Sequence, residues 1–332
     1  MTAPTITAPQ LPAIRAELAE WLTDTGPNGG PVAWSEGFDG QTAVQERANA
    51  GRWAASLRAA ELFFVATDMT RLAVAAGEAL PAYRLHPEEL PAQHGLLMWE
   101  EPVNQGLRGG EATTAPVIAV TWAVRTGGVA VRTWVHREDW LTYMAEGDAR
   151  AGIRDLTPDE VRAVRQRYPQ PITAMAETWL PFGKLPGWLF SAPPPGLSLY
   201  EQEDRARTLG WLQQVERALV VTWLLMGQTL ATARDIEPPR SAVKFIRRID
   251  PGMLAATRYV QLRHRGFGPE AQADAGGPGR TYQHRWLVRG HWRNHWYPSR
   301  QDHRPIWINT HVKGPNGAPL LDPDKLVNIL RR

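Results

Sequence analysis

Hydrophobic residues recur with helical spacing in the first eighty residues. Ile14, Leu18, Trp21 and Leu22 form one stripe, which predicts an amphipathic helix over Leu11–Thr23. Two further segments with helical character are predicted to be helices, Ala43–Ala60 and Met69–Leu80. The N-terminal part of the chain is therefore expected to be largely helical.

Short runs of β-favouring residues interrupt these helices and predict a small sheet. Gly127-Gly128 separates two of the runs and predicts a tight hairpin turn. The predicted strands are Leu62–Val65, Gly95–Trp99, Val117–Arg125 and Val129–Val135. Thr157, followed by Pro158 and Glu160, then predicts the start of another helix with a capping box.

A Pro- and Gly-rich segment, Phe182–Gly196, is the best candidate for a linker. After it, a long helix is expected from Glu203 to about Ala233, apolar on every face in its middle, and then a short basic helix over Ala242–Ile249, capped by Ser241. We therefore predict an α+β protein with an acidic domain over residues 1–192 and a second domain over residues 193–332.

The charge distribution changes the picture of the second domain. Residues 1–239 contain 20 Lys or Arg and 28 Asp or Glu, a formal net charge of −8. Residues 240–332 contain 17 Lys or Arg and 6 Asp or Glu, a formal net charge of +11. They also contain six of the nine histidines. A division of this size indicates a polyanionic partner for the C-terminal part. Only four of the 37 basic residues are lysine, which suits bidentate phosphate recognition but also agrees with a GC-rich genome.

The basic residues of this part alternate with apolar ones along the segment Tyr282–Tyr297. If the segment is a strand, one face is largely apolar and aromatic. The other face carries Gln283, Arg285, Leu287, Arg289, His291, Arg293, His295 and Tyr297. Residues on one face repeat every ~6.6–6.8 Å, close to the phosphate spacing of a nucleic-acid strand, about 6–7 Å.

Flanking strands are predicted over Arg258–Arg265 and Arg304–Lys313. The three strands would form an antiparallel module that packs its apolar face on the long helix. Its basic face would bind RNA or single strands in preference to duplex DNA, without strong sequence reading. The expected contact residues are Arg263, Arg265, Arg285, Arg289, Arg293, Tyr297, Trp307, His311 and Lys313. Alternatively, the module is an antiparallel sheet with one solvent-exposed face that happens to be basic and has no binding role.

Two further functions remain open for this module. His291 and His295 could act as general acid and base in a metal-free nuclease or another phosphate-handling enzyme, with Arg289 and Arg293 as clamps. On a strand these histidines would lie about 13 Å apart, which disfavours a shared metal ion. Alternatively, the acidic N-terminal part could cover the basic sheet and release it for a protein partner.

The end of the chain also resembles a known group of sequences. The run His284–Asn294 continues with Trp296–Ser299, His303–Ile308 and Lys313–Pro315, and it resembles an uncharacterised group of actinobacterial and mobile-element proteins. The resemblance covers roughly the last 75 residues and implies an actinobacterial host or phage context. It transfers no catalytic role.

Several classes of protein and site are excluded or disfavoured. The chain has no cysteine, and its first ten residues lack the pattern of a signal peptide. The most apolar run, Ala218–Gly227, has about half the length needed to span a bilayer. No Walker loop, nucleophile elbow or dinucleotide-binding turn is present. We expect a cytoplasmic protein with no cofactor and no bound metal, whose oligomeric state the sequence leaves open.

Overall fold

The computed structural model describes residues 5–24, 43–107, 114–145, 154–184, 199–263, 283–298, 301–315 and 318–321. These residues form two compact units. The first comprises Met1–Glu78 and Ala82–Leu262, and the second comprises Ala79–Pro81 and Arg263–Arg332. The division falls after Leu262 and not at the predicted boundary of 192/193. Most of the predicted linker, from residue 185 onwards, lies outside the described residues.

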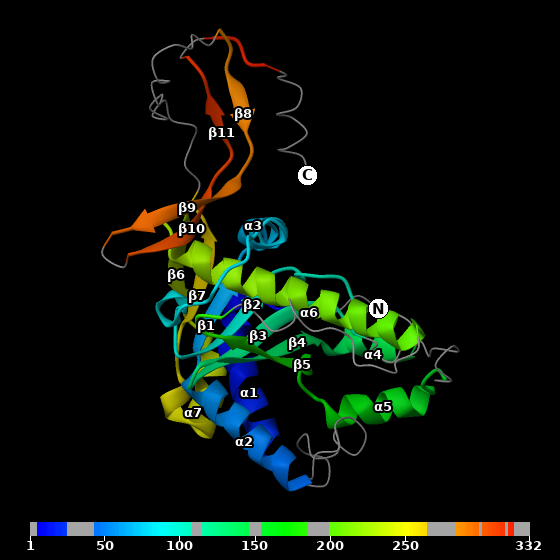
Figure 1. The fold of residues 1–332 in the computed structure, drawn as a ribbon. Coiled ribbons are helices and arrows are strands. Elements are labelled where there is room, and N and C mark those ends of the chain that lie inside the picture. The colour runs from blue at the N-terminus through cyan, green and yellow to red at the C-terminus, as the bar shows by residue number, and fades with distance from the viewer. Residues whose placement is uncertain are drawn as a thin grey trace. The chain divides into compact units, whose positions relative to one another are not determined.

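A seven-stranded sheet organises the first unit (Figure 1). Its strand order is β5-β4-β3-β2-β1-β7-β6, and β1 is parallel to both of its neighbours while the other pairs are antiparallel. The strands are β1 (Glu61–Val65), β2 (His94–Trp99), β3 (Val117–Arg125), β4 (Gly128–His136), β5 (Ile172–Pro181), β6 (Ala231–Ile236) and β7 (Thr257–Leu262). The α+β class is confirmed, although the sheet is larger than predicted.

Helices cover both faces of this sheet. They are α1 (Leu11–Thr23), α2 (Ala43–Ala59), α3 (Thr67–Glu78), α4 (Arg137–Ala145), α5 (Pro158–Arg167), α6 (Leu199–Met226) and α7 (Arg240–Ile249). Short 3-10 turns are formed by Ala8–Gln10, Pro87–Glu89 and Pro251–Met253. α1, α2 and α7 share one buried cluster with the sheet, to which Leu18, Leu57 and Ile246 contribute. On the other face Trp223 of α6 packs against Trp122, with ring centroids 5.2 Å apart.

The central strands explain why the sheet forms. Leu62–Val65 and Leu96–Trp99 are buried residue after residue, as expected for strands covered on both faces. Gly95 allows the ring of Trp122 to lie flat on the neighbouring strand, because a Cβ there would stand 2.2 Å from that ring. The predicted hairpin between β3 and β4 is confirmed, with Gly127 at a φ of 85°.

Two predictions about the C-terminal half are wrong. The segment that begins near Arg258 does not join the histidine-rich strand, because β7 lies between β1 and β6 with Val260 buried in the first unit. The long helix ends at Met226, directly before Gly227, and does not continue to Ala233. Ala231–Ile236 instead forms the edge strand β6, whose backbone pairs with β7.

The second unit contains two small antiparallel pairs. β8 (Trp286–Val288) pairs with β11 (His311–Lys313), and β9 (His291–Tyr297) pairs with β10 (Asp302–Ile308). The register is the same in both pairs, since Val288 opposes His311 and His291 opposes Ile308. The four strands therefore form a two-stranded ribbon that is interrupted at Arg289-Gly290 and Asn309-Thr310. It takes the place of the predicted three-stranded module.

Candidate nucleic-acid interface

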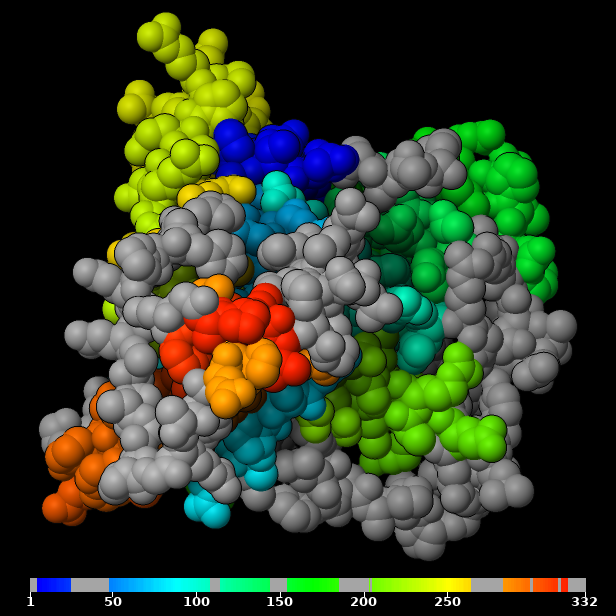
Figure 2. Space-filling model, turned by 90° about the horizontal axis from the view of Figure 1, so that it is seen from above, coloured from blue at the N-terminus to red at the C-terminus, as the bar shows by residue number. Residues whose placement is uncertain are grey.

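The outer pair of the ribbon, β9 with β10, has two chemically different faces. Residues that directly oppose each other across an antiparallel pair project from the same face. His295 opposes Arg304 and Arg293 opposes Ile306, whereas Trp292 opposes Trp307. Basic and aromatic side chains are thereby sorted to opposite sides. Orange residues of this pair lie at the molecular surface in Figure 2.

We call the side formed by His291, Arg293, His295 and Tyr297 the basic face. The first three side chains are exposed and Tyr297 is half-buried. The rings of His295 and Tyr297 meet edge to face, with centroids 5.0 Å apart. None of the four forms an ion pair with a residue in the described ranges, so the positive charge of Arg293 is not offset there by a carboxylate. Arg293 can therefore accept an anion without first breaking an ion pair to a described residue.

The opposing strand modifies this face. Ile306 and Ile308 project from the same side and are half-buried, so the face is not purely polar. Arg304 also lies here, but its side chain is only 12% exposed and its Nε lies 4.0 Å from a carboxylate oxygen of Asp302. Asp302 is the one acidic side chain of β9 and β10. The exposed basic side chains of the basic face therefore all belong to β9.

The opposite side, which we call the aromatic face, carries Trp292, Trp296, His303 and Trp307. Trp292 and Trp307 meet edge to face with centroids 5.3 Å apart, and the Trp296 and His303 rings lie 4.8 Å apart. Gly290 leaves room for this packing, because a Cβ there would stand 2.5 Å from Cζ2 of Trp307. Trp296 is 44% exposed, so one large aromatic surface remains open to solvent.

Hydrogen bonds orient two of the histidines. Nδ1 of His291 lies 3.0 Å from the Arg289 carbonyl oxygen, and Nδ1 of His311 lies 2.9 Å from that of Asn309. Because a carbonyl oxygen only accepts, each Nδ1 carries the proton and donates it. Nε2 is then left as the other polar atom of each ring. These bonds hold both rings at the first residue of their strands.

The structure brings together part of the predicted site. His291, Arg293, His295 and Tyr297 share the basic face, and Arg289 is exposed in the interruption beside them. The remaining predicted residues lie elsewhere. Arg263 follows β7, and Arg265 lies outside the described residues.

Three further predicted contact residues are not on the basic face. Trp307 belongs to the aromatic face, so its assignment to the basic face was wrong. His311 and Lys313 of β11 oppose Val288 and Trp286, so they share a side with the apolar residues of β8. The register explains why Trp307, His311 and Lys313 are not on the basic face. The sequence of one strand shows which of its residues share a side, but only the pairing register shows which of these two sides carries the basic residues of the partner strand.

The guanidinium of Arg285 is already engaged within the second unit. Its Nε donates to the Ala318 carbonyl oxygen at 2.8 Å, and the backbone of Arg285 also bonds Pro319 and Leu321. These bonds fix the residues after β11 against the start of β8. Arg285 therefore has a structural task that its place in the alternating pattern did not indicate.

Sequence reasoning did not single out Trp296 and His303 as a surface pair. The signal was present, because a hairpin between Tyr297 and Asp302 places these two residues opposite each other. The prediction instead treated Trp296 as part of a buried face. Its side chain is instead 44% exposed.

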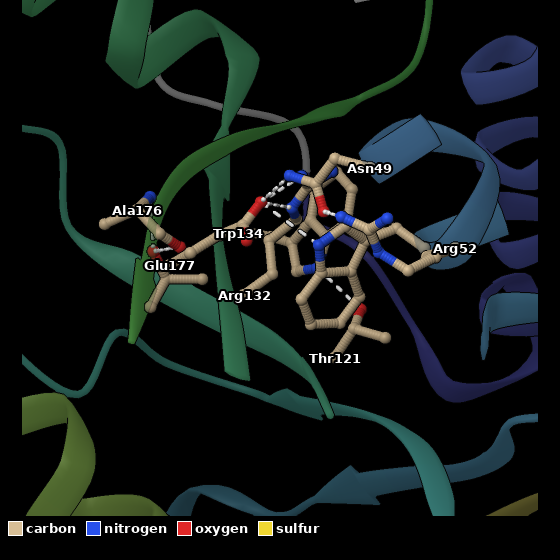
Figure 3. Close-up of polar contacts among 9 residues, drawn as sticks. Asn49, Arg52, Thr121, Arg132, Trp134, Ala176 and Glu177 are labelled. Atoms are coloured by element: carbon tan, nitrogen blue, oxygen red, sulfur yellow. Dashed lines mark hydrogen bonds and ion pairs between the residues drawn. The ribbon is translucent and has the colours of Figure 1, made fainter. Parts of the chain in front are cut away.

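The first unit contains a polar cluster at a different place, between α2 and the strands β4 and β5 (Figure 3). One oxygen of Glu177 accepts hydrogen bonds from Asn49, Trp53 and Arg132, the first two at 3.1 Å. The guanidinium of Arg132 also lies 4.9 Å from the Trp53 ring centroid. Burial lowers the pKa of Arg132, and the charge and hydrogen bond of Glu177 oppose that shift. Since the donors are satisfied internally, the cluster ties α2 to the sheet.

Neither a metal site nor a membrane span is found in the parts of the chain that the structure describes. No group of three or more His, Asp or Glu side chains there could hold a metal ion. No helix among those residues is long and apolar enough to cross a bilayer.

Comparisons with known proteins add little to this geometry. The chain matches no protein-family model, and no curated protein sequence matches it. The crystal structure of AcrVA2 aligns with 91% of this chain and 93% of its own, with a TM-score of 0.35 and 12% sequence identity. A similarity at this level supports no inference about the chain.

Proposed function

We propose that this chain binds nucleic acid through the basic face of β9, and that it prefers RNA or other single strands to duplex DNA. The observation that carries the proposal is the exposed row of His291, Arg293 and His295, with Arg289 beside it. Alternate residues of a strand are ~6.6–6.8 Å apart, so the row can follow successive phosphates of an extended strand. Contacts of this kind fix position without reading sequence.

The charge of the second unit supports the same partner. Residues 263–332 contain 12 Lys or Arg and 5 Asp or Glu, a formal net charge of +7. A field of this sign speeds the encounter with a polyanion and is screened by salt. The ring of Tyr297, which lies on the basic face and is half-buried, offers a surface on which an unpaired base can stack, which favours single strands.

A salt titration tests the proposal. Labelled single-stranded RNA, single-stranded DNA and duplex DNA are titrated with the full-length protein at a series of salt concentrations. The logarithm of the affinity is expected to fall linearly with the logarithm of salt, by about 0.7 per contacted phosphate on single strands. Absence of retention of all three probes at low salt would overturn the proposal.

A pair of matched variants tests the assignment to the basic face. Arg293→Gln removes one charge from that face and should lower the salt slope by about 0.7 on single strands. Lys313→Gln removes the same charge from β11, outside the basic face, and its slope should stay close to that of the parent. Equal losses from both variants would show that net charge, and not the basic face, controls binding.

The nuclease alternative is less well supported by the geometry. His291 and His295 are four residues apart on a strand, about 13 Å, so they cannot act together on one phosphate. A single general acid or base typically contributes ~10²–10⁴-fold in rate. If either residue serves catalysis, His291→Gln or His295→Gln should slow RNA cleavage by about that factor while binding persists. We expect the RNA to remain uncleaved with the parent and with both variants.

A further inference from the structure

Helix α7 presents a second row of cations, in the first unit and outside the ribbon. Arg240, Lys244, Arg247 and Arg248 are all exposed, whereas Ala242 and Ile246 on the opposite side are buried against the core. Three of the cations follow the spacing i, i+4, i+7 and so lie on one helical stripe, spread over about 10 Å of the axis. The apolar side of α7 packs on α1, so the cations face solvent.

Several other arginines of the first unit are paired with carboxylates. Arg71 pairs with Glu101 and Arg162 with Asp159, each at 2.7 Å, and Arg58 lies 3.8 Å from Glu20. None of the four cations of α7 forms an ion pair with any residue in the described ranges. A shortage of carboxylates does not explain the missing ion pairs of α7, because residues 1–262 contain 25 Lys or Arg and 29 Asp or Glu, a net charge of −4.

Helix stability explains only part of the row. Arg247 and Arg248 lie in the last turn, where the helix dipole stabilises positive charge. Arg240 is the first residue of α7, where the same dipole destabilises a cation, and the first turn contains no acidic residue. Lys244, one turn further on, gains no ion pair either. A cation that costs stability at its position, and that has no acidic partner, indicates a role in binding.

We infer that α7 is a second phosphate-binding surface that grips the same nucleic-acid strand as the basic face of β9. This inference rests on the proposed function, since it assigns to α7 the same partner. The two surfaces belong to different units, and the chain from Arg263 to Arg285 connects β7 to β8. A strand long enough to reach both surfaces would be held by linked contacts, which raises its affinity well above that of either surface alone.

The decisive variant is the full-length protein with Arg240→Gln, Lys244→Gln and Arg247→Gln. Glutamine preserves helix propensity, so α7 should stay folded, and an unchanged far-ultraviolet circular dichroism spectrum verifies this. The matched control is Arg58→Gln, Arg71→Gln and Arg162→Gln, which removes the same charge from paired arginines. Both proteins and the parent are titrated with one long single-stranded RNA over a range of salt concentrations.

We expect the α7 variant to lower the salt slope by about 2, which is three contacts of 0.7 each, and to bind about 100-fold more weakly than the parent at 0.1 M salt. The control variant should bind like the parent. If the α7 variant and its control behave alike while the parent binds, the inference about α7 is wrong and the proposal for β9 stands. If the parent binds no nucleic acid, both fail together. If the α7 variant loses affinity and Arg293→Gln does not, α7 binds nucleic acid without the basic face of β9, and the inferred joint binding of one strand is wrong.

Discussion

At the scale of single residues, Gly290 decides whether the aromatic face can form. A Cβ at this position would stand 2.5 Å from Trp307, closer than real contacts allow. We expect Gly290→Ala to displace Trp307 from Trp292 and to destabilise the ribbon by about 1–3 kcal/mol. Tryptophan fluorescence during denaturant unfolding measures this. Gly210→Ala in α6 is the control, because open space surrounds that position and alanine should stabilise the helix by about 0.5–1 kcal/mol.

Glu177 is a second residue whose substitution should affect stability, since one of its oxygens accepts hydrogen bonds from three donor residues. Glu177→Gln keeps the shape but leaves the buried guanidinium of Arg132 without its counter-charge. Because Glu177 is itself 42% exposed, we expect a loss of only about 1–3 kcal/mol in the free energy of unfolding. Glu101→Gln breaks the exposed pair with Arg71 and should cost less than about 1 kcal/mol. Equal losses in a denaturant titration would contradict a special role for the cluster.

At the scale of elements, two histidines at strand ends couple the first unit to pH. Burial lowers the pKa of His136 at the end of β4, although Asp139 opposes the shift. Burial, followed by the charge of Arg125, lowers the pKa of His94 at the start of β2. In both cases the unfolded chain takes up the proton more readily than the folded one. Their stabilising contribution is complete above about pH 6.5 and is lost as the pH falls through the folded pKa.

In the variants His136→Gln and His94→Gln, the free energy of unfolding should therefore decrease less on acidification than in the parent. The free energy of unfolding of each variant is compared with that of the parent at several values between about pH 7.5 and pH 5. As the pH falls, the free energy of unfolding of the parent should decrease more than that of the variant. The extra decrease should be about 1.4 kcal/mol for each unit by which folding lowers the pKa of the histidine. Parallel curves over this range would refute the assignment for the histidine concerned.

At the scale of the whole molecule, the position of β7 controls where the chain can be divided. β7 lies between β1 and β6, so removing it would expose one edge of β1 and detach β6. A fragment of residues 1–262 retains all seven strands and should unfold cooperatively. A fragment of residues 1–239 lacks β7 and α7 and should fail to do so. Cooperative thermal unfolding of the shorter fragment would contradict the observed strand order.

Much of the fold follows from local patterns that the sequence contains by itself. The stripe of Leu18 and Leu22 predicted α1, and the capping box of Thr157 and Glu160 predicted the start of α5. Gly127 marked the β3–β4 hairpin, whose turn needs a positive φ. The charge division and the alternation along β9 also needed no structure. Each of these signals arises within a few residues, where steric and hydrogen-bonding preferences act directly.

Only the tertiary structure decided which partners these elements take. β7 was predicted as a strand, but its parallel pairing with β1 joins residues nearly 200 positions apart, such as Thr257 and Leu62. The side of the ribbon on which Trp307 lies depends on register, and a strand's own alternation is the same for either choice. Pairing and register are set by how many apolar side chains are buried together across the whole unit. That sum is a property of the folded chain, so no single segment of the sequence can express it.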